Sequence, residues 1–372
     1  MDTHFDFSSL AQTLKELNPK KAKFCLGIER FLKKELLLSD ELKDTQIILG
    51  VSGGVDSLAL FFILFFLRPR LGYNLSLAHL NHGLRKEAET ESLWIKQLAE
   101  HFNIPCFIKY TDINAEAKKL KIGTEEAGRK ARYAFFIEIA RQYSDKTVFI
   151  TTAHHLDDLS EEVLLRLIRG TGWTALAGMS ALKQFNHDYY LNSFSEPSNQ
   201  TNDLQQKKYL LRPLLLTPKS ELIDFMQSLN CPWHEDASNL SSVYKRNRVR
   251  NLIMPLILEE NPNFREKVAQ LWQLARIDEE YWNTQVINKI TLNDNAVTLS
   301  YEFLLKQNKA LRLRLYKNAL ESLNAGDVLF QTLFKLDNAI ITKQTGKEFE
   351  FSHSKAARLI PQGVTFYLKN TK

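Results

Sequence analysis

Residues 47–57 read IILGVSGGVDS, and the apolar run Leu58–Leu67 follows almost at once. The short apolar run before the glycines predicts a buried strand, and the longer one after them predicts a helix. Two adjacent glycines allow a sharp turn between the two elements. A buried strand, a tight turn and a helix in this order are typical of an α/β fold.

The turn, residues 52–57, predicts a phosphate site. Glycines leave backbone N–H groups accessible, the helix N-terminus attracts anions, and Ser52 and Ser57 add hydroxyl donors. The lysine of the kinase and GTPase phosphate loop is missing, so hydrogen bonds, the dipole and a metal ion would have to neutralise the charge. The motif is similar to the pyrophosphate loop of the ATP pyrophosphatases. That resemblance implies Mg²⁺ on Asp56 and ATP binding by Ser52, Gly53, Gly54, Val55, Asp56 and Ser57. The alternative is a glycine-rich turn that binds nothing.

The composition favours an ordinary globular protein. The chain has 372 residues, 44% of them hydrophobic and 25% charged, which suggests two or three domains. No secretory signal is evident, and the longest apolar run is too short to span a bilayer. Cys25, Cys106 and Cys231 are far apart, which argues against a zinc site, an iron–sulfur site or a disulfide framework. We therefore expect a cytoplasmic protein that does not bind a membrane.

Positive charge is concentrated in the C-terminal part. Residues 241–372 contain 20 Lys and Arg against 13 Asp and Glu, whereas the whole chain has a net charge of +6. A basic part beside a nearly neutral one indicates a polyanionic partner, most naturally a nucleic acid. The alternative is a basic face that is merely solvated.

Strands and helices alternate after residue 45, which predicts a parallel, doubly wound sheet covered on both faces. Ligands of such sheets bind beyond the carboxyl ends of the strands. The expected strands are Ile47–Val51, Leu75–His79, Pro105–Tyr110 and Thr147–Thr152, and the expected helices are Ser57–Leu67, Glu87–His101, Glu125–Tyr143 and Asp158–Arg169.

Four segments follow from the pattern. Residues 1–45 predict one or two amphipathic helices, separated at Asn18-Pro19, and residues 46–218 an ATP-binding catalytic domain. A polar insertion is expected at 186–208. Residues 219–322 predict a helical domain, with helical structure over Pro255–Leu320 that includes Phe303–Leu320. Residues 323–372 predict a small mixed domain with a short helix and strands such as Glu348–Phe351 and Val364–Leu368.

Four further polar clusters contain the remaining candidate residues, at 79–85, 123–133, 152–162 and 233–250. In the third cluster, Asp158 and Glu161 are three apart at a helix start and face one way. With neighbouring histidines they could bind Mg²⁺, act as a general base or hold a cationic substrate. The second cluster places Arg129 and Arg132 on one helix face, and the fourth suits a phosphate backbone through Lys245, Arg246, Arg248 and Arg250. Taken singly, each cluster could also be a polar loop, a charged helix or a helix cap.

Together the clusters resemble one family, the tRNA(Ile)-lysidine synthetases. The resemblance spans roughly Ile47 to Pro255 and includes Arg169-Gly170-Thr171-Gly172 and Arg212-Pro213-Leu214-Leu215. The chain departs from the pattern at Glu161-Glu162, where the family often has Glu-Thr, and in its longer lead-in, 1–45. The resemblance implies an adenine nucleotide alpha hydrolase-like fold with a helical middle domain, 219–322, that binds tRNA.

The resemblance also implies a reaction. ATP adenylates the wobble cytidine of an isoleucine tRNA with a CAU anticodon, and L-lysine then displaces AMP to give lysidine. The catalytic residues would be Asp56, Arg129, Arg132, His154, Asp158 and Glu161, with either arginine holding the adenylate phosphate. His154 and Asp158 would position or deprotonate the lysine amine, and His79 and Asn81 would lie near the adenine or ribose.

Three alternatives remain at the level of sequence. A tRNA thiolase commonly needs paired cysteines, and a glutamine-dependent synthetase needs an ammonia-supplying domain, and neither feature is evident. A tRNA-binding protein with a decayed ATP site is disfavoured by the intact motifs at 52–57 and 154–161. A homodimer is compatible with the sequence, which does not define the oligomeric state.

Overall fold

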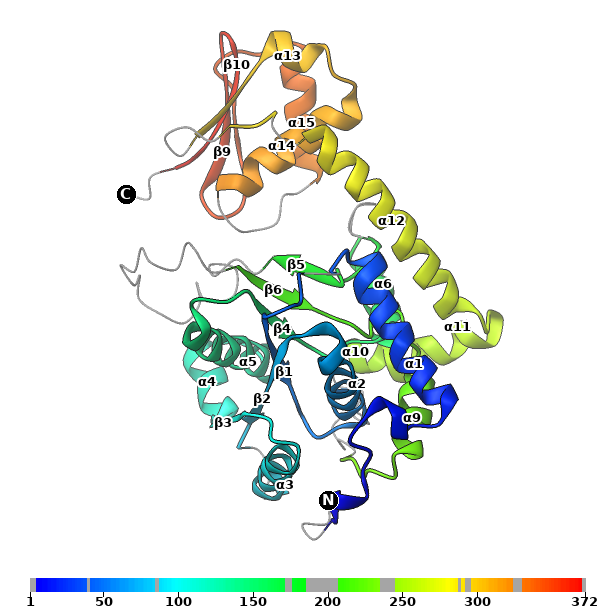
Figure 1. Ribbon diagram of the computed structural model, residues 1–372. Helices are drawn as coiled ribbons and strands as arrows, with labels where there is room; N and C mark the ends of the chain where they lie inside the picture. Colours follow the sequence, from blue (N-terminus) through cyan, green and yellow to red (C-terminus); the bar gives the residue numbers. More distant parts are fainter. Residues whose placement is uncertain are drawn as a thin grey trace. The chain divides into compact units, whose positions relative to one another are not determined.

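A computed structural model describes residues 5–38, 41–83, 87–170, 176–184, 207–234, 245–286, 289–291, 296–323 and 330–369 (Figure 1). The chain forms two compact units, residues 1–170 with 178–269, and residues 171–177 with 270–372. The expected tRNA-binding domain, 219–322, is thus divided between the two units. Its functional boundaries stay predictions, and most of the expected insertion at 186–208 lies outside the described residues.

The first unit is built on a six-stranded sheet with the order β3-β2-β1-β4-β6-β5 (Figure 1). Neighbouring strands are parallel except β5, which pairs antiparallel with β6. The expected parallel, doubly wound sheet is confirmed. Its strand order reverses between β1 and β4, where such sheets bind ligands. The strands are β1 Gln46–Gly50, β2 Asn74–Asn81, β3 Cys106–Tyr110, β4 Val148–Thr151, β5 Leu182–Gln184 and β6 Lys208–Leu211.

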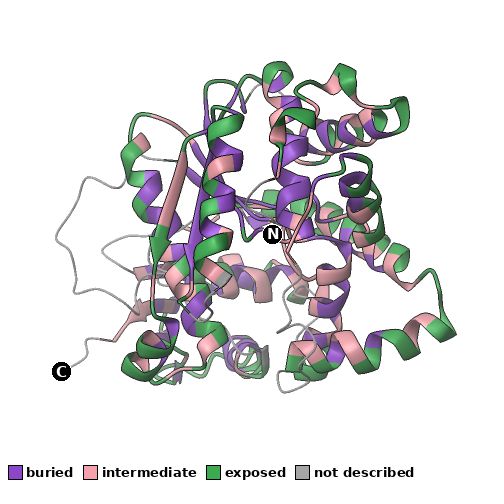
Figure 2. Ribbon diagram, turned by 90° about the horizontal axis from the view of Figure 1, so that it is seen from below, coloured by how far each residue is buried: buried purple, intermediate pink, exposed green. Residues whose placement is uncertain are grey.

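Helices cover both faces of this sheet, with α2 and α5 on opposite sides (Figure 1). One apolar layer contains Phe61 of α2, Trp94 of α3 and Phe225 of α9, and the other packs Phe136 of α5 against Ile150 of β4. Figure 2 shows buried residues along the strands and on the inner sides of these helices. The helices are α2 Val55–Leu71, α3 Glu87–His101, α4 Ile113–Leu120, α5 Thr124–Ala140, α6 Leu156–Arg169, α9 Lys219–Ser228, α10 Lys245–Arg248 and α11 Met254–Glu260.

The expected strands and helices between residues 46 and 169 are present, with ends shifted by a few residues. The helix α4 is absent from the sequence prediction, although Asp112 caps it by accepting from the Ala115 N–H at 3.0 Å. The expected helix to Tyr143 ends at Ala140, and a 3₁₀ turn, Arg141–Tyr143, completes it.

The N-terminal lead-in packs onto the first unit. Of the one or two helices predicted for residues 1–45, the one before Asn18 is not formed. Residues 7–9 and 14–16 form two 3₁₀ turns instead. Side chains there satisfy the backbone locally, as where Glu16 accepts from the Gln12 N–H at 2.8 Å. The second helix is confirmed as α1 Pro19–Arg30, capped by Asn18 and continued by the π turn Phe31–Glu35. Leu10 and Leu32 lie in the apolar core.

The second unit combines helices with a four-stranded antiparallel sheet of order β7-β10-β9-β8. Two predictions are corrected here. The segment expected to be helical, Pro255–Leu320, contains a strand, and the helix expected over Phe303–Leu320 is two helices, interrupted near Asn308, which caps the second by accepting from the Leu311 N–H. The strand β9 was not predicted. The elements are α12 Phe264–Val286, shared between the units, β7 Ala296–Ser300, α13 Tyr301–Leu305, α14 Lys309–Leu323, α15 Phe330–Ile341, β8 Glu348–Glu350, β9 Lys355–Ile360 and β10 Gly363–Leu368.

Candidate active site

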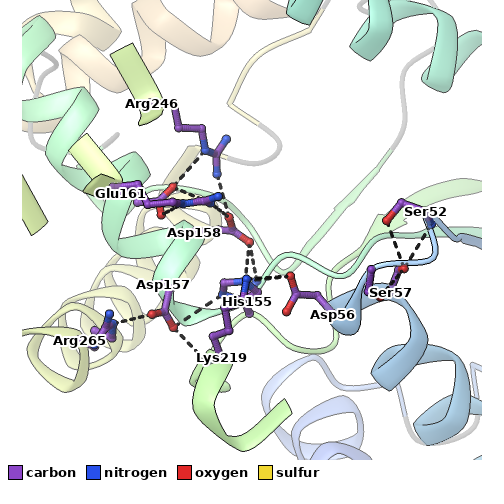
Figure 3. A network of polar contacts seen from close by, with 12 residues as sticks. Ser52, Asp56, Ser57, His155, Asp157, Asp158, Glu161, Lys219, Arg246 and Arg265 are labelled. Carbon is purple, nitrogen blue, oxygen red and sulfur yellow. Dashed lines mark hydrogen bonds and ion pairs between the residues drawn. The ribbon is translucent and has the colours of Figure 1, made fainter. Parts of the chain in front are cut away.

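The loop of residues 52–57 joins β1 to α2, as predicted. Ser57 Oγ accepts from the Ser52 N–H at 3.2 Å, lies 3.3 Å from Ser52 Oγ and donates to the Gly54 carbonyl at 3.0 Å (Figure 3). Gly53 has a φ of 79°, a conformation that favours glycine. These contacts hold the loop in a tight turn around its own serines.

The N-terminus of α2 faces this loop and can receive an anion. Gly54 is the N-cap residue, and within the described residues no side chain caps the first turn. The first N–H groups of a helix have no partner inside it, and the helix dipole adds positive potential there. The loop therefore has the donors that a pyrophosphate group requires.

A second polar group lies at the turn from β4 to α6. His155 is the N-cap of α6, and its N–H donates to Asp158 Oδ2 at 3.1 Å. Asp157 accepts from the Lys219 N–H at 3.0 Å, and its other carboxylate oxygen lies 2.7 Å from Arg265 Nε. Asp157 therefore links α6 to α9 and α12, a capping role expected of an acid at a helix start.

The imidazole of His155 joins the two polar groups (Figure 3). Its Nε2 atom lies 3.5 Å from Asp56 Oδ2 and 3.4 Å from Asp158 Oδ2, and its Nδ1 atom lies 3.7 Å from Asp157 Oδ2. Burial lowers the pKa of His155, but the three carboxylates raise it, and the net shift is upward. Lys219 Nζ, 3.6 Å from Asp56 Oδ2, adds a positive charge beside that carboxylate.

Asp158 and Glu161 form an acid pair on α6, as their spacing predicted, and two arginines contact both. Arg250 Nε and Nη2 donate to the two Glu161 oxygens at 2.6 and 3.0 Å, and Nη2 also donates to Asp158 Oδ1 at 3.1 Å. Arg246 donates to Asp158 Oδ1 and Glu161 Oε2, each at 3.2 Å. Burial raises the pKa of Asp158, but the charges of His155 and Arg246 and the hydrogen bond from the His155 N–H lower it, and the net shift is downward. Asp158 is therefore ionised at neutral pH.

His154 lies beside this pair and is uncharged. Its Nδ1 atom is 2.9 Å from Thr152 Oγ1. Burial, then the charge of Arg212, lowers the pKa of His154 to about 3. A group with so low a pKa is a weak proton acceptor at neutral pH, which favours a positioning role over deprotonation.

His79 and Asn81 are buried near the end of β2, at 4% and 3% exposure. His79 Nδ1 lies 2.9 Å from the Val51 carbonyl and Nε2 lies 3.1 Å from Ser92 Oγ. Asn81 donates to Ala88 and Ser92 and accepts from the Gly83 N–H. Both side chains thus brace the strand end, and their contact with adenine or ribose stays a prediction.

The two arginines of α5 differ in their surroundings. The Arg129 guanidinium lies 5.1 Å from the centre of the Tyr133 ring. Its charge contributes to the lowered pKa of His154, after burial, Arg212 and Arg246. Contact of Arg129 or Arg132 with the adenylate stays a prediction.

Asp56 fits a ligand of Mg²⁺. Its Oδ1 atom is buried and, among the described residues, has no hydrogen-bond partner. The described residues contain no group of three or more His, Cys, Asp or Glu arranged to enclose a metal. Mg²⁺ is commonly bound through one or two carboxylates together with substrate phosphates, which suits a single aspartate beside a phosphate loop.

The basic cluster at 245–250 divides into two parts. Arg246 and Arg250 contact the acid pair, whereas Lys245 and Arg248 are exposed. Binding of tRNA by these four residues stays a prediction.

Sequence reasoning did not select His155 or Lys219 for the site. The doubled histidine was a visible signal for His155, but its burial could not be read from the motif.

A strand, a Ser-Gly-Gly-Val-Asp-Ser turn and an open helix N-terminus at the reversal of the strand order define a PP-loop nucleotide-binding protein. A family model described as a PP-loop domain matches residues 26–257. The tRNA(Ile)-lysidine synthase of Nitratidesulfovibrio vulgaris is 35% identical over 345 residues, which are 87% of this chain and 92% of that protein. The chain belongs to the tRNA(Ile)-lysidine synthase family.

Other relatives and structures place this match in context. The synthase of Petrotoga mobilis is 34% identical over 229 residues, 62% of this chain and 65% of that protein. Against several further relatives the chain also spans less of their length, such as 64% for one from Clostridium perfringens. A U34-tRNA thiolase of Methanococcus maripaludis superposes with a TM-score of 0.48 at 18% identity, covering 69% of this chain and 80% of that one. No helix within the described residues is long and apolar enough to cross a membrane.

Proposed function

We propose that this protein joins L-lysine to the wobble cytidine of isoleucine tRNA with a CAU anticodon, giving lysidine, AMP and pyrophosphate. Family membership supports the proposal, and one observation carries it: Asp56 at the phosphate loop and Asp158 at the acid pair lie on either side of one histidine nitrogen. Residues suited to phosphate and residues suited to an ammonium group therefore share one site.

In the first step, the cytosine ring carbonyl oxygen attacks the α-phosphorus of ATP. The bond to the pyrophosphate oxygen breaks, and pyrophosphate is held by the N–H groups and hydroxyls of residues 52–57. When bound, Mg²⁺ neutralises charge on the leaving phosphates. Asp56 would hold it, and Arg129 or Arg132 would contact the α-phosphate.

In the second step, the lysine ε-nitrogen bonds to the activated ring carbon, and the bond to the AMP oxygen breaks. The ε-ammonium has an ordinary pKa of about 10.4, so it must lose a proton, to the Asp158 carboxylate or to water, before it attacks. The ionised Asp158, with the buried Glu161, would hold and orient the ammonium group. A cytoplasmic location and tRNA contacts in the basic C-terminal part belong to the same proposal.

The test is to incubate the purified protein with ATP, Mg²⁺ and labelled lysine. Isoleucine tRNA with CAU is compared with methionine tRNA of the same anticodon. We expect label to enter the isoleucine tRNA alone. Pyrophosphate release without label in either tRNA would overturn the proposed substrate.

Two variants separate the steps. Asp56→Asn should block pyrophosphate release, because it weakens the phosphate and Mg²⁺ site. Asp158→Asn should retain a single turnover of pyrophosphate release and lose lysine incorporation. Incorporation by Asp158→Asn at the unmodified rate would remove that residue from the second step.

A further inference from the structure

The acid pair proposed to bind lysine is already occupied by cations. Asp158 Oδ1 accepts from Arg246 and Arg250, while Asp158 Oδ2 accepts from the His155 N–H. Both Glu161 oxygens accept from Arg250, and one accepts also from Arg246. Two carboxylates thus face two guanidinium groups, and their charges balance. A lysine ammonium would find neither an unoccupied oxygen nor a net negative charge.

The arginines lie on the solvent side of the acids. The side chains of Glu161 and Asp158 are 4% and 14% exposed, whereas those of Arg246 and Arg250 are 26% and 31% exposed. A cation arriving from solvent would therefore meet the guanidinium groups before the carboxylates.

We propose that Arg246 and Arg250 occupy the lysine subsite in place of the lysine ammonium, and that they leave it when a nucleotide phosphate binds their guanidinium groups. This inference rests on the proposed function and concerns the control of the same site. Guanidinium groups bind phosphate bidentately, as they bind carboxylate, so the arginines lose little on exchanging partners. The lysine ammonium then takes their place on Asp158 and Glu161.

Charge accounting explains why the two events are coupled. If lysine displaced the arginines without phosphate present, two partly buried guanidinium groups would lose their carboxylate partners. Leaving one charge of a buried ion pair without its partner is strongly destabilising. If phosphate drew them away without lysine, the acid pair would be left unpaired. Binding of both ligands leaves every charge matched.

The geometry points to the nucleotide as the source of phosphate. Contacts run from Asp56 at the loop through His155 to Asp158, which Arg250 contacts. Burial lowers the pKa of Arg250, but Glu161, Asp158 and then Asp56 raise it, and the net shift is upward. The guanidinium of Arg250 therefore interacts electrostatically with the loop residue Asp56. The acids belong to α6 and the arginines to α10 and the π turn Val249–Ile253, so the two sides can separate. Such π turns often mark functional sites.

The first test uses the unmodified protein. L-lysine is titrated calorimetrically into the protein alone, and into protein saturated with Mg²⁺ and α,β-methylene ATP. We expect the lysine Kd to fall by about tenfold or more with the nucleotide, and the nucleotide Kd to fall equally with lysine. Equal lysine affinity in both states would overturn the inference. So would tightening by isoleucine tRNA alone, because the phosphate would then come from the tRNA backbone.

Variants test the arginines directly. The double variant Arg246→Gln with Arg250→Gln should bind lysine about tenfold more tightly than the unmodified protein without nucleotide, and should lose the nucleotide effect. Arg265→Gln is the matched control, since it removes a similarly exposed arginine from the neighbouring Asp157. The control should keep the full nucleotide effect. A double variant that binds lysine no better than the control contradicts the inference, provided that its circular dichroism spectrum is unchanged.

Arg250→Lys guards against misfolding of the double variant. It keeps the positive charge but not the bidentate contact. Its lysine affinity without nucleotide should therefore lie between that of the unmodified protein and that of the double variant. Failure of the underlying function looks different: lysine would not bind in any state, and no label would enter tRNA. If label enters tRNA but lysine binds equally well with and without nucleotide, the inference about the arginines is wrong and the proposed function still holds.

Discussion

His155 Nε2 lies 3.5 Å from Asp56 Oδ2, and this contact joins the turn after β4 to the helix after β1. The two strands are neighbours and parallel, so their carboxyl ends deliver both residues to one edge of the sheet. The same nitrogen lies 3.4 Å from Asp158. The buried His155 side chain therefore sets the distance between Asp56 at the phosphate loop and Asp158 of the acid pair.

Replacing His155 by Gln should slow both steps. Without the imidazole, three carboxylates around the position lose their shared partner, and Asp56 and Asp158 move apart. Displacement of catalytic groups by about 1 Å can lower a rate about a hundredfold. We expect losses of this order in single-turnover pyrophosphate release and in lysine incorporation.

His154→Gln, one residue away, is the control for that variant, because the His154 ring contacts Thr152 Oγ1, whereas the His155 ring lies against the three carboxylates. It should retain pyrophosphate release better than His155→Gln. A loss confined to the second step in His155→Gln would show that His155 does not position Asp56.

Removing Mg²⁺ should stop turnover without unfolding the protein. Asp56 offers one buried oxygen without a partner among the described residues, so the ion depends on the nucleotide phosphates for its remaining contacts. A chelator should therefore abolish ATP cleavage and leave the melting temperature of the nucleotide-free protein unchanged. A melting temperature that falls with the chelator would reveal a structural metal instead.

His154 predicts a pH dependence of stability. Its pKa is about 3 in the folded protein against an ordinary value of 6.5, because burial disfavours the charged ring. As the pH falls below 6.5, the unfolded chain takes up a proton that the folded protein refuses, so the free energy of unfolding falls. The slope from one such group is about 1.4 kcal/mol per pH unit.

The comparison of His154→Gln with the unmodified protein isolates this contribution, because all other groups titrate in both. Urea unfolding at pH 7, 6 and 5 should show the variant gaining relative stability as the pH falls. A stability difference that stays constant over this range would mean that His154 has the same pKa in the folded and the unfolded protein.

The sequence predicted the secondary-structure elements of the first unit but did not predict which side chains form ion pairs. Apolar runs with clear ends define the strands and helices from residue 46 to 169, and the spacing of Asp158 and Glu161 placed them on one face. Their partners lie 85 to 92 residues further along the chain. In sequence Arg246 and Arg250 belong to a basic run that resembles a phosphate surface, and only the packing of the π turn Val249–Ile253 against α6 reveals the ion pairs. Likewise, the doubled histidine does not show which ring is buried between carboxylates.

Gly50→Ala should destabilise the first unit. A Cβ atom at Gly50 would lie 2.6 Å from Cζ of Phe136, which is 1% exposed and has little room to move. Overpacking of this kind costs about 1–3 kcal/mol. Gly27→Ala is the control, since its Cβ would meet nothing within 4 Å in the helix α1, and it should stabilise the protein by up to about 1 kcal/mol. Urea unfolding measures both, and a neutral Gly50→Ala would mean that α5 shifts without cost.

In the second unit, Arg312 and Asp337 form a buried ion pair that should respond differently to single and double replacement. Arg312 donates to the two Asp337 oxygens at 2.7 and 3.0 Å, and the Tyr316 hydroxyl donates to one of them at 3.1 Å. Asp337 is fully buried. Asp337→Asn leaves the guanidinium without its counter-charge, and such a loss costs about 3–5 kcal/mol. Hydrogen exchange of residues 296–369 should report it.

The double variant Arg312→Met with Asp337→Leu removes both charges together. Replacing a whole buried pair by apolar side chains is often close to neutral, so this variant should exchange more slowly than Asp337→Asn. Lysine and nucleotide affinities should stay unchanged in both variants, because the candidate site belongs to the first unit. Equal destabilisation by the single and double replacements would show that packing of the two side chains, and not their charge, stabilises the second unit.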